Sequence, residues 1–425
     1  MSSIVPAVFT GVTFLVALRR LPLLHPIQLW SGSWAVSTAL YSLRLLPYRS
    51  LSWLTAGLIC GSVVVFAVAT PLGARIARRR RESPSAREDA APLELAAWLA
   101  LGLLALTLAV FLAQLVSRFG LTRALRITVE VKVYLASAEA PLSGVYVEAA
   151  VAGAALCALA GARAGNVAAR RRWLIGALAC AATAYFSTSR GFIAIGLIAA
   201  LTAVGVAGVS LSRRTLLAMG LAAAVTILTL FFGLGAVIGK TYGSSGIGQF
   251  DNFFSRNPAV SSLALPYEDL TAGIPALDVL VHNSTTWGRA HGCATAPIAC
   301  GVVRKLGVPA VRVPVTAPFT RAPLQWNAYT FLDRFLIDGG TALTLVLVAA
   351  TGTIAGYLWA RARAGATVAI LVYSISAPAL VFAYRQNLIE LVLLAAVLAA
   401  VLLLLARVLA PLTTSRSRRP VQPAG

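Results

Sequence analysis

The sequence is poor in charged residues: Asp, Glu, Lys and Arg together make up 12% of its 425 residues. Soluble globular domains carry about twice that fraction, which excludes a cytosolic, secreted or disordered protein. Hydrophobic residues reach 59%. Uninterrupted apolar runs of about 20 residues recur along the chain, and this is the length of a helix that crosses the hydrocarbon core of a bilayer. The composition therefore predicts an integral membrane protein.

Lysine is also scarce, since only Lys132, Lys240 and Lys305 stand among 36 basic residues. The formal net charge is nevertheless +22, because only 14 residues are acidic. In a soluble protein such a charge indicates nucleic-acid binding. Here the arginines gather at the ends of apolar runs, where basic residues mark the cytoplasmic side of a membrane. We therefore expect the lipid bilayer as a partner and no nucleic acid.

The apolar runs predict an all-α fold, a polytopic membrane helix bundle of about eleven spans, with residues 1–425 forming a single integral-membrane domain. The expected spans are 4–18, 27–46, 51–73, 93–116, 142–162, 173–188, 191–210, 215–238, 335–359, 367–384 and 387–409. Arginine clusters fall in alternate connections, at 19–20, 75–87, 163–172, 213–214, 361–363 and 416–419. The positive-inside rule then leaves the N-terminus and the other connections outside.

A long extracytoplasmic loop, residues 239–334, separates spans 8 and 9 in this interpretation. It contains no spanning run and is rich in Pro, Gly, Ser and Thr. A connection of this length usually carries function. The shorter outer connection 117–141 alternates apolar and basic residues, a pattern that suits a segment lying flat on the membrane.

No Gly-rich phosphate loop and no cluster of metal ligands occurs in the sequence, so we expect no cofactor and no metal. His291 stands near Cys293 but lacks a second ligand pair at the usual spacing. Of the five cysteines, three fall inside expected spans, where a thiol serves as a small apolar side chain. Cys293 and Cys300 lie in the outer loop, where oxidising surroundings permit a disulfide. Two free thiols are the alternative.

Arginine also stands at an outer membrane junction, as Arg190 in the segment FSTSRGFIAIG. An arginine at this depth is costly unless it meets an anion, so a carboxylate or phosphate partner is one interpretation. The other is a side chain that only snorkels to the lipid headgroups.

Bases outnumber acids in the outer loop, and an arginine fork can hold phosphate oxygens in a bidentate way. The candidate diphosphate ligands are Arg256, Arg289 and Arg321. A solvated surface that keeps the loop off the bilayer is the alternative interpretation for each of them.

Histidine and aspartate supply candidates for proton transfer. Imidazole is the most frequent general acid or base in proteins, so His282 and His291 are candidates, although an ordinary polar role in the loop is the alternative. Asp338, in FLIDGG, falls in the outer leaflet, where a carboxylate needs a partner or a wet cavity. Arg385 and Glu390 flank another outer junction and offer a further pair.

Four segments resemble the oligosaccharide repeat-unit polymerase family, the O-antigen polymerases of bacterial surface polysaccharide assembly. The first, residues 25–73, begins HPIQLWSGSW and has Pro26, Trp34 and Ser52 in the family's places. The others are FSTSRGFIAIG, PYEDLTAGIPALDVLV and NAYTFLDRFLIDGG. These short motifs are spread over most of the chain.

The resemblance implies a multi-pass glycosyltransferase of the bacterial cytoplasmic (inner) membrane. Its substrates would be polyprenyl diphosphate-linked glycans, and its protein partners a flippase and a chain-length regulator. By motif position, only Arg190 carries over as a family arginine. We expect diphosphate binding by Arg190 with one or more of Arg256, Arg289 and Arg321, and help to the acceptor hydroxyl from Asp338 or His282.

Other functions remain open at this stage. An O-antigen ligase shares the spans and the large late loop, and a loop histidine has a role there. Arabinosyl and mannosyl transferases carry an acidic motif in the first outer loop, whereas this chain has no acid before Glu82. A polysaccharide or lipid transporter would show broken helices and charged pairs inside the membrane. A structural anchor without activity is the last alternative.

Overall fold

A computed structural model describes residues 2–79, 90–126, 131, 143–184, 190–207, 251–282, 290–309, 320–321, 325–326, 330–385 and 388–416. Within these ranges the chain is helical, as expected, apart from two short strands, β1 (Thr320–Arg321) and β2 (Gln325–Trp326). The strands pair antiparallel, with Thr320 opposite Trp326.

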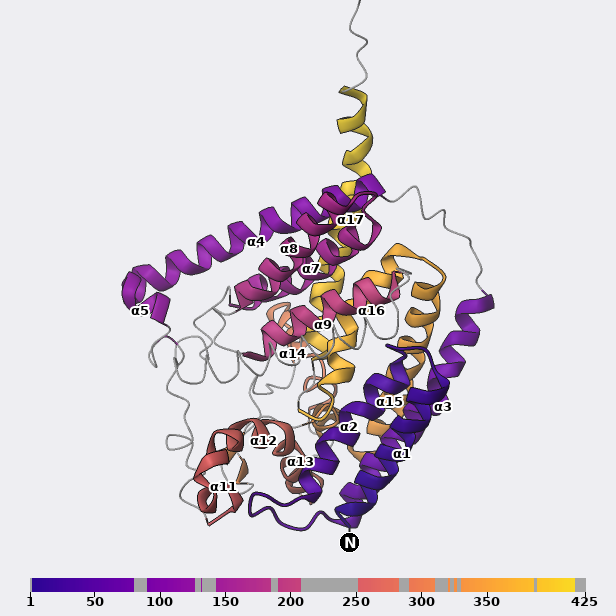
Figure 1. Ribbon diagram of the computed structural model, residues 1–425, viewed down its shortest axis with the longest axis vertical. Helices are drawn as coiled ribbons and strands as arrows, with labels where there is room; N and C mark the ends of the chain where they lie inside the picture. The colour runs from indigo at the N-terminus through magenta and orange to yellow at the C-terminus, as the bar shows by residue number, and fades with distance from the viewer. Residues whose placement is uncertain are drawn as a thin grey trace, which may run out of the picture. The chain divides into compact units, whose positions relative to one another are not determined.

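The helices follow one another along the chain, and Figure 1 shows most of them by label. They are α1 (Ile4–Arg20), α2 (Pro26–Ser42), α3 (Trp53–Arg79), α4 (Ala90–Phe119), α5 (Leu121–Arg126), α7 (Ser143–Arg163), α8 (Val167–Thr183), α9 (Arg190–Val206), α11 (Phe253–Arg256), the 3-10 helix η3 (Pro258–Leu263), α12 (Ala264–Thr271), α13 (Gly273–His282), α14 (Pro297–Lys305), α15 (Asp333–Arg363), α16 (Thr367–Val381) and α17 (Ile389–Arg416).

The chain divides into two compact units, each assembled from three separate stretches of sequence. The first comprises Met1–Arg80, Leu228–Ala360 and Ser376–Val392. The second comprises Arg81–Ile227, Arg361–Ile375 and Leu393–Gly425. Each of α15, α16 and α17 therefore contributes residues to both units.

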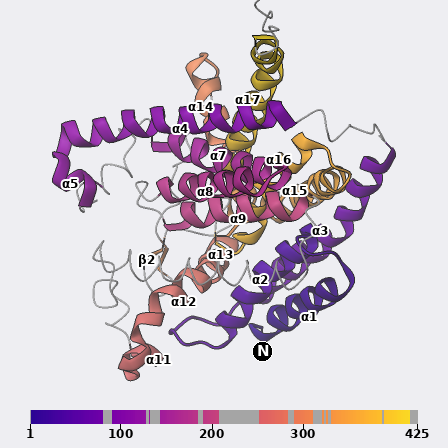
Figure 2. The ribbon, with the colours of Figure 1, turned by 45° about the horizontal axis from the view of Figure 1, so that its top comes forward.

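In the first unit, α1 and α2 form an antiparallel hairpin, visible beside α3 in Figure 2. The side-chain amide of Gln28 closes the connection by donating to the carbonyl oxygens of Ala17 and Leu21, at 3.0 and 2.9 Å. Further along, the hydroxyls of Thr10 and Thr38 lie 3.0 Å apart. Polar side chains inside a membrane bundle need such partners, because no water is present to replace them.

Glycines let α3 and α15 approach closely. A Cβ atom at Gly73 would lie 1.8 Å from the carbonyl oxygen of Thr353, and one at Gly356 would lie 2.0 Å from that of Thr70. Only glycine permits this backbone contact, the usual device by which membrane helices pack. Since later residues of α3 meet later residues of α15, the two helices run parallel.

Two basic clusters of the first unit lie at the same end of its helices. His25, the N-cap of α2, packs against Trp359 near the end of α15, with the rings 4.5 Å apart. The α1–α2 connection that follows Arg19–Arg20 therefore lies beside the end of α15, and α3, parallel to α15, ends there with Arg78 and Arg79. The sequence predicted one common side for these clusters.

Helix α15 is broken at Gly339 and Gly340, where the φ angle of Gly340 is 71°. This left-handed conformation favours glycine, because a Cβ atom would clash with the backbone. A Cβ atom at Gly339 would also lie 2.2 Å from the side chain of Leu343. The glycine pair thus separates a short first helix, ending at Asp338, from the long second part.

Aromatic rings link the start of α15 to α2 and α3. Phe331 packs on Trp30 with the ring centroids 5.1 Å apart, the ring of Trp30 stacks on Phe66 at 4.7 Å, and Gly352 of the long part of α15 also faces Phe66. Phe331, Trp30 and Phe66 are all fully buried. The chain is therefore already buried among the helices where α15 begins.

The second unit is built around α7, whose apolar stretch is 83% buried. Helices α4, α8 and α9 pack against it, and they run side by side in both ribbon views (Figures 1 and 2). Alanine dominates the contacts, and Gly153 faces Cys180 at a distance of 3.0 Å from its Cβ position. Small side chains allow this dense packing.

Among the described residues, five helices are long and apolar enough to cross a membrane, namely α3, α4, α7, α15 and α17. Helices α9 and α16 are apolar but shorter. Every span expected from the sequence coincides with a helix except 215–238, which lies outside the described residues. The chain thus has the helices of a multi-pass membrane protein.

Candidate functional site

Residues 251–282, in the segment predicted to be the outer loop, pack within the first unit beside the connection 43–52. The hydroxyl of Tyr267 donates to the carbonyl oxygen of Leu40 at 2.9 Å and accepts from the amide of Leu45 at 3.1 Å. Burial raises the pKa of Tyr267 to about 12. The phenol therefore keeps its proton and its donor role at neutral pH.

His282 lies at the end of α13, and its ring is held by Asp278. Its Nδ1 atom is 2.7 Å from the carbonyl oxygen of Asp278. A carbonyl oxygen can only accept, so Nδ1 carries the proton and Nε2 has the free lone pair. The side chain of His282 is 58% exposed. Asp278 is itself fixed by Ser52, whose amide and hydroxyl donate to Oδ1 at 3.0 and 2.6 Å.

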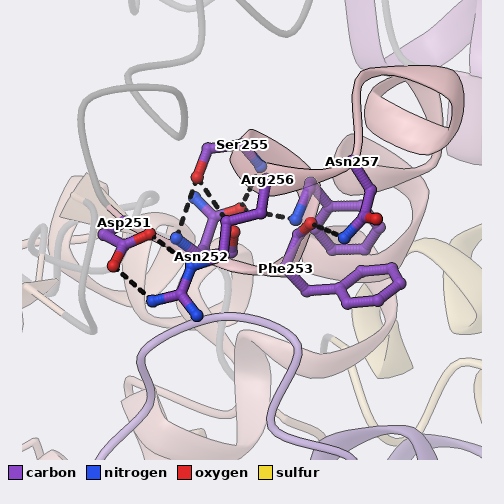
Figure 3. Close-up of polar contacts among 7 residues, drawn as sticks. Asp251, Asn252, Phe253, Ser255, Arg256 and Asn257 are labelled. Atoms are coloured by element: carbon purple, nitrogen blue, oxygen red, sulfur yellow. Dashed lines mark hydrogen bonds and ion pairs between the residues drawn. The ribbon is translucent and has the colours of Figure 1, made fainter.

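Arg256 ends the short helix α11, and Figure 3 shows it facing Asp251. Its guanidinium donates to both carboxylate oxygens, with the Nε to Oδ1 distance at 2.7 Å. This hydrogen bonding lowers the pKa of Asp251. Both side chains are 70% exposed, and an ion pair in water contributes little. A capping box formed by Asn252 and Ser255 fixes the turn.

Asp338 is buried, and its carboxylate gathers the segment 292–295 of the outer loop. Oδ1 accepts from the amides of Gly292 and Ala294 at 2.9 and 3.0 Å. Oδ2 accepts from the amide of Thr295 at 2.8 Å and from its hydroxyl. Each carboxylate oxygen thus accepts two hydrogen bonds, and the carboxylate has its usual number of donors. In this arrangement Asp338 holds the segment 292–295 in place.

The same loop segment is fastened at two further points. Arg334 donates to the carbonyl oxygen of Ala294 at 3.1 Å. Cys293 and Cys300, the pair that the sequence allowed to bond, form a disulfide with their Cα atoms 5.5 Å apart. The segment is thus tied to the first part of α15 and to α14.

Arg385 forms an ion pair with Asp269 of α12, with a nitrogen–oxygen distance of 3.0 Å. The sequence alone suggests Glu390 as the neighbour of Arg385, and nothing in it connects Arg385 with Asp269. The only sequence signal for Asp269 is its place in PYEDL, one of the segments of the resemblance. The pair joins the outer loop to the turn that follows α16.

Within the part of the chain that the structure describes, Nε of Arg385 and Oδ1 of Asp333, at the start of α15, are buried without a hydrogen-bond partner. The two segments meet directly, because the amide of Phe331 donates to the carbonyl oxygen of Ala383 at 2.6 Å. The amide of Tyr384 is bonded to the hydroxyl of Ser33 in α2 at 3.3 Å.

Three of the predicted site residues have side chains that the structure describes. Arg256, His282 and Asp338 share no hydrogen bond or ion pair with one another. Arg289 lies outside the described residues. Arg190 begins α9 and Arg321 lies in β1, but their side chains are outside the described part. Their diphosphate-binding roles stay predictions.

Among the residues described, no group of three or more His, Cys, Asp or Glu side chains could hold a metal ion. Comparison of the chain with protein-family models, with curated proteins and with solved structures finds no match.

Proposed function

We propose that this protein is a glycosyltransferase of the bacterial cytoplasmic membrane, with about eleven spans and the outer loop 239–334. It joins polyprenyl diphosphate-linked oligosaccharide repeat units into a surface polysaccharide on the outer face of the membrane. The proposal starts from the resemblance of FSTSRGFIAIG and NAYTFLDRFLIDGG to the repeat-unit polymerases.

One structural observation carries the proposal: the outer loop packs at the end of the first unit opposite to the basic clusters. Tyr267 of the loop contacts Leu40 and Leu45, at the C-terminal end of α2. The clusters after α1 and α3 lie beside the N-terminal end of α2. Since basic ends face the cytoplasm, this supports an outer position for the loop. A folded outer loop suits a substrate whose lipid stays in the membrane.

In the proposed reaction, the oxygen of an acceptor hydroxyl attacks the anomeric carbon of the donor sugar. The bond from that carbon to the diphosphate oxygen breaks, and the bonding electrons leave with the lipid diphosphate. The hydroxyl proton passes to a base. Of the two candidates, His282 has a free lone pair on an exposed ring, whereas Asp338 already accepts four hydrogen bonds. We therefore assign the base to His282.

Cells that lack the protein provide the primary test. A polymerase predicts accumulation of single repeat units on the polyprenyl carrier at the outer face. Finished polymer that remains on the carrier would instead indicate a ligase. Repeat units that stay on the cytoplasmic face would indicate a transporter, and an unchanged pool of lipid-linked glycans would contradict all three.

Substitutions test the assigned roles in the purified, membrane-embedded protein. Arg190→Ala should abolish polymer formation while the protein still inserts into the membrane, and full-length polymer from this variant would refute its role. His282→Asn should slow polymer formation by about 10²- to 10⁴-fold, the usual contribution of a general base. His291→Asn is the matched control, because Asn tolerates the φ angle of 48° at this position.

A further inference from the structure

One carboxylate holds part of the loop 239–334 to the first part of α15. We call this contact the Asp338 clasp; it comprises Asp338 and the segment 292–295. Three main-chain amides and one hydroxyl of the segment donate to the two carboxylate oxygens. Asp338 is 6% exposed, so little water reaches the contact. The donors must therefore converge on the carboxylate in one arrangement of the backbone.

The backbone that leads into the Asp338 clasp has a conformation that is unfavourable on its own. The φ angles of His291 and Gly292 are 48° and 89°, and both lie in the left-handed region. Glycine adopts this region freely, but the Cβ atom of His291 makes it costly there. Such a conformation persists where the surrounding structure holds it. The turn that presents the amides to Asp338 therefore depends on support from another part of the chain.

The disulfide between Cys293 and Cys300 provides this support. Cys293 lies within the segment 292–295, whereas Cys300 lies in α14. The backbone of the same stretch is hydrogen-bonded, since the amide of Cys300 donates to the carbonyl oxygen of Ala296 and the amide of Ala296 to that of Gly292, both at 3.0 Å. A covalent ring removes conformations that the detached segment would otherwise adopt, so it favours the attached state.

We propose that the disulfide between Cys293 and Cys300 is a redox switch for the Asp338 clasp. Its reduction frees the segment 292–295 from Asp338, because the detached segment then gains conformations that the ring had excluded. Oxidation restores the ring and the attachment. The switch goes beyond the proposed glycosyl transfer and does not depend on it.

The loop has attachments to the first unit that do not involve the two cysteines. The hydroxyl of Tyr267 donates to the carbonyl oxygen of Leu40 at 2.9 Å. Asp269 forms its ion pair with Arg385 at 3.0 Å. Both contacts are made by α12, which precedes the disulfide in the sequence. Reduction therefore frees the segment at the Asp338 clasp while α12 stays in place.

The reduction step requires a dithiol, which supplies two electrons and two protons. A thiolate of the dithiol attacks Sγ of Cys300, because this residue is half-buried whereas Cys293 is only 4% exposed. The bond between the two cysteine sulfurs breaks, and its electron pair and a proton go to Sγ of Cys293. The second thiol of the donor then displaces Cys300, whose sulfur takes the other proton. The products are two cysteine thiols and a donor with its own disulfide.

Hydrogen exchange of the full-length protein in phosphatidylcholine nanodiscs tests the switch, with dithiothreitol as the dithiol. Mass spectrometry measures the exchange of peptides that cover 290–296, and the mass of the alkylated protein shows whether the bond has been reduced. The variant Cys293→Ser with Cys300→Ser removes the bond and keeps side chains of similar size. The matched control is Cys60→Ser, which replaces a free cysteine of α3.

We expect dithiothreitol to accelerate exchange in 290–296 by about 10- to 100-fold, in the wild-type protein and in Cys60→Ser, as the entropy of a short ring predicts. The double serine variant should exchange at the faster rate with and without dithiothreitol. Peptides of α12 should keep their protection in every sample. Unchanged protection of 290–296 after verified reduction overturns the switch, and so does a bond that dithiothreitol does not reduce in the folded protein. Faster exchange throughout the first unit also overturns it, because the disulfide would then support the whole fold.

Discussion

The variant Asp338→Asn tests whether the carboxylate of Asp338 holds the segment 292–295, because it replaces a single oxygen atom by an NH₂ group. The shape of the side chain is kept, but one acceptor oxygen becomes an NH₂ group. In the wild-type protein both oxygens accept, from the amides of Gly292, Ala294 and Thr295 and from the Thr295 hydroxyl. The Thr295 hydroxyl can rotate to accept from the new NH₂ group, whereas the Thr295 amide is left facing another donor.

The expected loss follows from this arrangement. A buried donor without an acceptor costs about 1–3 kcal/mol, and the remaining hydrogen bonds weaken because their acceptor is no longer charged. Asp338 is 6% exposed, so water does not replace the lost acceptor. We expect the free energy of opening of the segment 292–295 to fall by about 2–4 kcal/mol. This corresponds to a roughly 30- to 700-fold larger equilibrium constant for opening.

Hydrogen exchange measured by mass spectrometry on the detergent-solubilised protein provides the assay. Amides in peptides that cover 290–300 should exchange faster in the variant by this factor, while amides of the buried helix α7 should not change. Asp251→Asn is the control, because this carboxylate is 70% exposed. Unchanged protection of 292–295 in Asp338→Asn would refute the conclusion that Asp338 anchors the loop.

Two other predictions concern the folded scaffold. Gly356→Ala should lower the thermal unfolding temperature, because its Cβ atom would lie 2.0 Å from the carbonyl oxygen of Thr70, whereas Gly57→Ala, with nothing within 4 Å, should not; equal unfolding temperatures would refute the helix contact. Maleimide labelling of the denatured, unreduced protein should detect three thiols, and five after reduction; five before reduction would contradict the disulfide between Cys293 and Cys300.

Hydropathy alone located the helices well, because a run of apolar residues in a bilayer must satisfy its backbone hydrogen bonds internally. It located their ends less well. The span expected at 173–188 corresponds to α8, which begins earlier, at Val167. The charge of the arginines at 170–172 predicts a connection between spans, but arginine is a good helix former. The side chain of Asn166 also caps the helix by accepting from the amide of Ala169 at 2.7 Å.

Hydropathy does not predict the break in α15. The pair Gly339–Gly340 stands inside an apolar run, and membrane helices tolerate glycine without breaking. Whether such a pair bends the chain depends on what packs beside it. Here Phe331 packs on Trp30 of α2, and the backbone leaves the helical conformation at Gly339 and Gly340.

The candidate site shows the same limit. The sequence identified Asp338, His282 and the loop arginines by residue type, but it gave no means to find their partners. Asp338 meets Gly292, 46 positions away, and Arg385 meets Asp269, 116 positions away. No local pattern encodes contacts over such separations. Asp338 holds the segment 292–295, and its assistance to the acceptor hydroxyl stays a prediction.

The sequence by itself indicated a helical, multi-pass membrane protein, and it predicted a common side for the basic helix ends. Both properties depend on the composition of single segments. An apolar run long enough to cross the bilayer predicts a span, and arginines at its end predict the cytoplasmic side. The tertiary structure alone decided that Asp338 anchors the outer loop and that Arg385 pairs with Asp269. These choices arise only when distant segments pack, because a buried charge accepts whichever partner the fold brings within hydrogen-bond distance.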